Sequence, residues 1–133
     1  MKRLFFSTLL ALCMFATGGL YRPAFAQHAH DHAAAGKKTF KGHIVCAACY
    51  LSHGEMGAGH KPCSTECAKA GIPMAILDTE SKTLYLPLAK NHHAPANTEL
   101  MAYVEQDVTV TGTVMERDGL KAIVIEKIEP VKK

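Results

Sequence analysis

The sequence lacks several features on which whole classes of function depend. It has no tryptophan, only 7% of its residues are aromatic, and beyond residue 26 it has no surplus of positive charge. Three of the 15 basic residues and none of the 12 acidic residues precede residue 27, so the rest of the chain carries 12 of each sign. A neutral segment with few stacking side chains has little with which to hold a nucleic-acid backbone or its bases. We therefore expect no nucleic-acid partner.

The motifs of common enzyme classes are missing as well. The chain contains no HExxH metalloprotease motif, no Gly-rich phosphate loop and no Ser-His-Asp order typical of a hydrolase. A covalent c-type haem needs a histidine directly after the second cysteine of a C-x-x-C pair, and Tyr50 stands at that position. The sequence excludes c-type haem and favours a binding protein over an enzyme.

Only one long apolar run is present, and it lies near the N-terminus. A positively charged start precedes an apolar run over residues 4–16, and Ala24-Phe25-Ala26 fits the small-x-small pattern of a cleavage site. The run is shorter than the roughly 20 residues that span a bilayer, and no second run follows. We expect residues 1–26 to be a signal peptide cleaved after Ala26, which predicts a periplasmic or secreted protein without a membrane span. Residues 27–38 then form a flexible, His-rich leader.

Beyond the leader, the apolar pattern predicts short β-strands. Alternating or continuous apolar runs of strand length are separated by turn-forming residues. The clearest pair flanks Asp118-Gly119, because an Asp-Gly dipeptide between two β-branched runs is typical of a tight hairpin turn. The predicted strands cover residues 39–45, 74–77, 82–88, 108–115 and 120–128.

Two helices are predicted between these strands. Residues 64–70 contain good helix formers and end at Gly71, a residue that commonly terminates a helix. Asn97 is a good N-cap for a second helix in which Leu100, Tyr103 and Val104 form an apolar stripe.

The resulting order resembles the OB-fold, a five-stranded Greek-key barrel with a helix between its third and fourth strands. The stretch Val108-Thr109-Val110-Thr111-Gly112-Thr113-Val114 and the return strand through Ile123-Val124-Ile125 carry most of this likeness. The chain looks most like the small bacterial secreted OB-like proteins. The resemblance spans about residues 39–129 and implies a mainly β (α+β) domain, which we place at residues 39–133. The Cys-rich insert at residues 46–71, after the first strand, is a departure from a plain OB-fold.

The insert holds every cysteine that remains after the predicted cleavage. Their spacing is C-x2-C-x13-C-x3-C, and two close pairs joined by a loop are typical of a tetrahedral thiolate site. Thiolate and imidazole donors suit Zn or Cu, and the nearby histidines are further candidate ligands. The predicted metal ligands are Cys46, Cys49, Cys63 and Cys67, with His60 and His53 in reserve.

A second hypothesis uses the same cysteines as disulfides. An oxidising compartment and a small core both favour bridges, each typically worth about 2–4 kcal/mol. The protein would then be a disulfide-stapled interaction domain that binds a protein, peptide or glycan. Under the metal hypothesis it is a metal-binding module with a handling, sensing or structural role, whose partner is the ion and a periplasmic protein. A redox-active dithiol at Cys46 and Cys49 is the weakest alternative, because no cation adjoins the pair to lower a thiol pKa.

Overall fold

The structure, a computed structural model, describes residues 36–91 and 93–132. The predicted signal peptide, its cleavage site and most of the His-rich leader lie outside these residues. None of the described helices has the length and apolar character needed to cross a membrane. The elements in chain order are β1 (Gly36–Cys46), α1 (Ala47–His53), the 3-10 helix η1 (Ala58–His60), α2 (Lys61–Lys69), β2 (Met74–Asp78), β3 (Leu84–Leu88), the 3-10 helices η2 (Ala96–Glu99) and η3 (Met101–Tyr103), β4 (Asp107–Arg117) and β5 (Leu120–Pro130).

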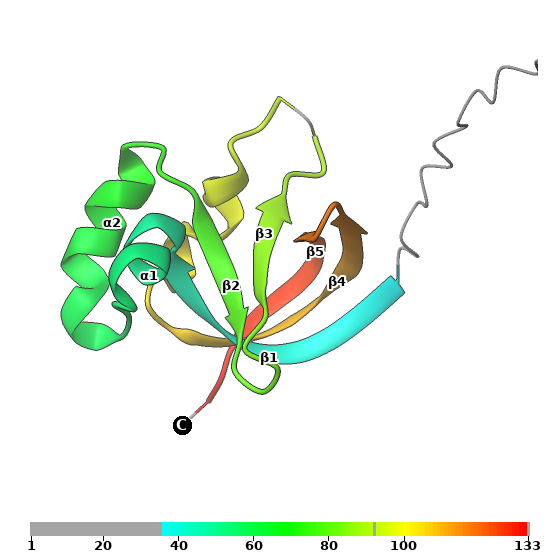
Figure 1. The fold of residues 1–133 in the computed structure, drawn as a ribbon, viewed down its shortest axis with the longest axis horizontal. Helices are drawn as coiled ribbons and strands as arrows, with labels where there is room; N and C mark the ends of the chain where they lie inside the picture. Colours follow the sequence, from blue (N-terminus) through cyan, green and yellow to red (C-terminus); the bar gives the residue numbers. More distant parts are fainter. Residues whose placement is uncertain (1–35, 92, 133) are drawn as a thin grey trace, which may run out of the picture. The chain divides into compact units, whose positions relative to one another are not determined.

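The five strands close into a barrel in the order β1-β2-β3-β5-β4 (Figure 1). The pairs are antiparallel except for β3 and β5, which run parallel and complete the barrel. The predicted hairpin joins β4 and β5, and both of its turn residues have positive φ, 50° at Asp118 and 82° at Gly119. This is the backbone that an Asp-Gly type I′ turn requires. The prediction of a mainly β domain with a five-stranded barrel is confirmed.

β1 begins at Gly36, within the range predicted as leader, and is long enough to pair with two strands. Residues 36–43 pair with β4 and residues 42–46 pair with β2, so Gly42 and His43 belong to both ladders. A Cβ atom at Gly42 would lie 2.7 Å from Cγ2 of Ile76, closer than side chains tolerate. The absence of a side chain at Gly42 therefore lets β1 pass close to β2 where it changes partner.

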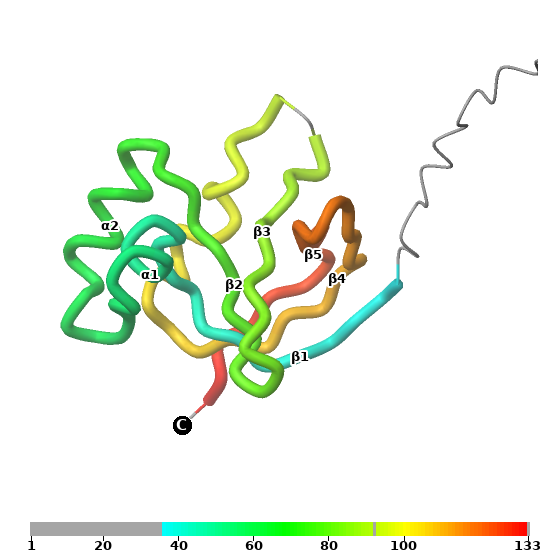
Figure 2. Tube along the Cα trace, in the orientation of Figure 1, coloured from blue at the N-terminus to red at the C-terminus, as the bar shows by residue number. Residues whose placement is uncertain are grey.

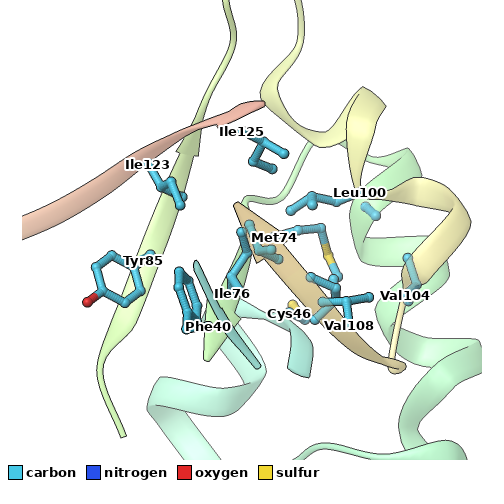
Figure 3. Packing of buried hydrophobic residues seen from close by; sticks show 13 residues of the cluster. Phe40, Cys46, Met74, Ile76, Tyr85, Leu100, Val104, Val108, Ile123 and Ile125 are labelled. Carbon is cyan, nitrogen blue, oxygen red and sulfur yellow. The ribbon is translucent and has the colours of Figure 1, made fainter. Parts of the chain in front are cut away.

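The barrel interior is packed with aliphatic side chains and two aromatic rings. Figure 3 shows Phe40, Ile76, Tyr85 and Ile123 at one end of this core, and Met74, Leu100, Val104 and Val108 toward the other. Cys46 belongs to the same cluster and is fully buried. The first predicted metal ligand is therefore fixed by the core itself, at the last position of β1.

The predicted helix between the third and fourth strands is wrong. The segment forms two 3-10 helices, η2 and η3, although Leu100 and Val104 are buried as the apolar stripe predicts. Asn97 makes no side-chain cap for its own helix. Its amide donates to the carbonyls of Ala68 and Ile72, at 3.2 and 2.8 Å, and its oxygen accepts from the N–H of Met74 at 2.9 Å. Asn97 instead holds the connection from α2 to β2.

A buried carboxylate closes the opposite end of β2. The side chain of Asp78 accepts from Nζ of Lys38 at 2.8 Å and from the backbone N–H groups of Glu80 and Ser81 at 2.9 and 3.1 Å. Burial alone would raise the pKa of Asp78, but these hydrogen bonds outweigh it and hold the pKa well below its usual range. Asp78 is therefore an ionised residue that ties the turn after β2 to β1.

Candidate metal centre

The insert between β1 and β2 places α1 and α2 side by side at one end of the barrel (Figures 1 and 2). Ala47 and Tyr50 of α1 pack against Val45, Ala75 and Leu77 on the outer face of β1 and β2. The helix ends at Gly54, whose φ of 71° allows its N–H to bond the carbonyl of Tyr50. This packing fixes the first turn of α1 directly after the buried Cys46.

One close pair of cysteines lies at the start of α1, and the other pair lies within α2. Cys46 precedes α1 and Cys49 follows in its first turn, while Cys63 and Cys67 lie four residues apart on α2. Residues three or four apart share a helix face, so each pair presents its two sulfur atoms to one side. α2 starts earlier than predicted because Pro62 occupies its first turn, where a missing N–H is tolerated.

The helices bring five candidate donor atoms together in two overlapping groups. The Sγ atoms of Cys46, Cys49 and Cys67 all lie within 4.8 Å of one another. A second group with the same spacing joins Sγ of Cys49, Sγ of Cys63 and a ring nitrogen of His60. Sulfur ligands of a tetrahedral zinc ion, with bonds of about 2.3 Å, stand about 3.8 Å apart. If the donor atoms of either group moved slightly closer together, all three could therefore bind the same ion.

His60 is arranged as metal-bound histidines commonly are. Its Nδ1 lies 3.0 Å from a carboxylate oxygen of Glu55, which fixes the orientation of the ring. Its Nε2 is buried and has no hydrogen-bond partner among the described residues. A carboxylate on one ring nitrogen and an ion on the other is the usual arrangement around a metal-bound imidazole. A buried nitrogen without a partner otherwise costs free energy, so a ligand at Nε2 would relieve that cost.

The four cysteines of the insert are free thiols, and two of them, Cys49 and Cys67, are hard to ionise. The hydrogen bond with Cys46, together with burial, raises the pKa of Cys49 to about 12. Burial, followed by the hydrogen bond with Cys46, also raises the pKa of Cys67. Neighbouring thiolates repel one another, and a bound cation would reverse this effect. A positive ion bound among the cysteines would therefore favour the thiolate form of Cys49 and Cys67.

Glu105, which the sequence did not reveal as important, fastens the insert to the barrel. Its side chain is fully buried in the turn before β4 and accepts from the N–H of Gly57 at 2.6 Å and from Oγ of Ser64 at 2.5 Å. Nε2 of His43 lies 3.1 Å from the same carboxylate. Gly57 and Ser64 flank His60 in the chain, so this carboxylate positions the segment that carries the imidazole donor.

The other histidines near the insert do not join the donors. His53 lies exposed at the last position of α1 and belongs to neither group of the described residues. His43 is buried between Glu105 and Asp107, with its Nδ1 2.7 Å from the Asp107 carboxylate. Of the predicted ligands, the structure thus brings together the four cysteines and His60, and leaves His53 apart.

The sequence carried only a weak sign of the supporting residues. Glu55 lies five positions before His60, and Ser64 directly follows a cysteine, but neither spacing is typical of a motif. Glu105 is one of several charged residues before a strand. No protein-family model, curated protein or solved structure matches the chain.

Proposed function

We propose that this protein is an exported metal-binding module, an OB-like barrel whose Cys-rich insert holds zinc or copper. One observation carries the proposal: four thiols and a ring nitrogen of His60 form two overlapping groups of donors, and Nε2 of His60 is buried without a hydrogen-bond partner among the described residues. The module would serve in metal handling, in sensing, or in keeping the insert folded.

The type of donor favours soft or borderline ions. Thiolate sulfur and imidazole nitrogen bind Zn(II) and Cu(I), whereas Mg(II) and Ca(II) require several oxygen ligands. The two donor groups contain no carboxylate. Glu55 contacts His60 instead, where it would orient the imidazole toward an ion.

The N-terminal sequence supports export. A signal peptide over residues 1–26 would send the domain to the periplasm or outside the cell, where thiols are readily oxidised. Thiolates bound to an ion are protected from that oxidation. A periplasmic protein that delivers or receives the ion is the partner such a module would have.

The test is the metal content of the full chain, expressed with its own N-terminal segment and purified without an affinity tag. We expect bound zinc or copper, free thiols after denaturation in chelator, and a lower melting temperature once the metal is removed. His60→Ala should reduce the metal content, whereas His53→Ala, which changes an exposed histidine outside both groups, should not.

Metal-free protein whose mass shows two disulfides, and whose melting temperature ignores chelator, would overturn the proposal. That outcome would favour the disulfide-stapled domain that binds a protein, peptide or glycan. Oligonucleotide binding, the third alternative, would appear in the same protein as an affinity that falls steeply with salt concentration.

A further inference from the structure

The candidate centre offers more donors than one tetrahedral ion uses. A structural zinc ion takes four ligands, and the insert presents five. The five donors divide into two groups of three that have only Cys49 in common. A single tetrahedral ion would leave one donor unused. Nε2 of His60 is buried and has no hydrogen-bond partner within the described part of the chain, so the imidazole in particular needs a ligand.

The two groups differ in their access to solvent. The inner group, Cys46, Cys49 and Cys67, is built on the barrel: Cys46 is fully buried, and Cys49 and Cys67 pack against the core. The outer group, Cys49, His60 and Cys63, has an exposed cysteine. One group is thus a closed position in the fold, and the other lies open at the surface of the insert.

Groups of three soft donors favour a particular ion. Cu(I) is bound stably by two or three thiolate or imidazole ligands, whereas Zn(II) fills four positions. A thiolate sulfur has several lone pairs and can bind two ions at once. The negative charge of four thiolates exceeds the positive charge of two monovalent ions, so a pair of Cu(I) ions leaves no excess positive charge in the cluster.

We propose that the insert binds two Cu(I) ions, bridged by the thiolate of Cys49. Cys46 and Cys67 complete the inner site, and Cys63 and His60 complete the outer site. This inference rests on the proposed function, since it specifies the ion and the number of ions at the same centre. Each cysteine that binds loses its proton to solvent, and both ions remain Cu(I) throughout.

The difference in exposure gives the two ions different tasks. The inner ion is enclosed by β1, α1 and α2 and exchanges slowly. The outer ion is reached at Cys63, where a donor or acceptor thiol can approach without unfolding the insert. His60, oriented by Glu55, supplies the imidazole ligand of the outer ion. The outer site is therefore the one through which copper enters and leaves.

The experiment is an anaerobic titration of the fully reduced, metal-free full chain with a Cu(I) complex, followed by native mass spectrometry. We expect two ions per chain, of which one is removed rapidly by a Cu(I) chelator and the other slowly. X-ray absorption of the loaded protein should show copper–sulfur scattering and a short copper–copper distance, which only a bridging ligand produces.

Variants separate the two sites. Cys63→Ser and His60→Ala should each keep one ion, the slowly exchanging one. Cys67→Ser should weaken the inner ion, and Cys49→Ser should abolish the copper–copper feature. His53→Ala is the matched control and should bind as the unaltered chain does. Circular dichroism of each metal-free variant checks that the barrel is folded.

A variant in which His28, His30 and His32 are all replaced tests whether the predicted leader contributes to the number of bound ions. The number of ions should stay at two in this variant. A single ion per chain would overturn the two-ion inference while leaving the proposed function intact. Three or more ions would overturn it as well, and no bound metal of any kind would overturn both.

Discussion

The carboxylate of Glu105 allows the sharpest test of how the candidate centre is held in place. Glu105→Ala removes the acceptor for three donors, the N–H of Gly57, the hydroxyl of Ser64 and Nε2 of His43. Hydrogen bonds to a charged partner contribute about 1.5–3 kcal/mol each. Their sum is an upper bound, because water enters the space left by the side chain. We expect a loss of about 3–5 kcal/mol, the cost typical of breaking a buried ionic contact.

Glu105→Gln separates the charge from the shape. The amide oxygen can keep the bonds from Gly57 and His43, because one carboxylate oxygen accepts both. The amide nitrogen then faces the hydroxyl of Ser64, which can turn and accept. The geometry survives and only the charge is lost, so we expect a cost of about 1–2 kcal/mol, near that of an ordinary hydrogen bond.

The assay is denaturant unfolding of the reduced, metal-free protein, with Glu80→Ala as control because Glu80 is exposed. The control should change the free energy of unfolding by less than about 0.5 kcal/mol. Hydrogen exchange should show the largest increase in Glu105→Ala at residues 54–64, and the affinity for metal should fall. If Glu105→Ala unfolds like the control and binds metal normally, this carboxylate does not fasten the insert.

Three further outcomes are expected of the barrel. Because hydrogen bonds depress the pKa of Asp78 in the folded state, its carboxylate stabilises the fold above about pH 4, and this stabilisation is lost as the pH falls below that value. Acid unfolding of Asp78→Asn should therefore lack the loss of stability that protonation of Asp78 causes. Gly112→Ala should lower the free energy of unfolding by more than about 2 kcal/mol in thermal unfolding, since its Cβ would lie 2.8 Å from Cγ1 of Ile123. Gly59→Ala is the control and should be nearly neutral, because open space surrounds Gly59. Asn97→Ala should lower the free energy of unfolding by about 2–3 kcal/mol in denaturant, because three hydrogen bonds between α2 and β2 are lost. If a substitution at Asp78, Gly112 or Asn97 leaves stability unchanged, the contact described for that residue is contradicted.

The strands were predictable because their determinants are local. The alternation from Val108 onward and the Asp118-Gly119 turn specify a hairpin through backbone preference and a single buried face. Leu100 and Val104 were correctly predicted to face the core. The prediction of their helix was wrong because the side chain of Asn97 bonds to α2 and β2 and does not cap its own segment. A hydrogen bond to a distant partner leaves no sign in the local sequence.

The sequence predicted which residue types form the candidate centre. It did not predict how the donor atoms divide into two groups. Cysteine spacing pointed to one converging set, since residues three and four apart share a helix face. The choice of His60 over His53 depends on where the chain turns between α1 and α2. That turn is held by Glu105, about 40 residues farther along the chain. Contacts over such a separation leave no periodic pattern, so sequence alone could not find them.

The composition of the insert explains why an ion would matter to this fold. Ala47 of α1 and Ser64 and Ala68 of α2 are the buried residues of the two helices, and none carries a large apolar side chain. Short helices with so little apolar surface gain little from the hydrophobic effect. The barrel has a complete core of its own, so loss of metal should loosen the insert while the strands persist. A centre built in this way can change its order with metal occupancy, which is the property that a metal-handling or metal-sensing module needs.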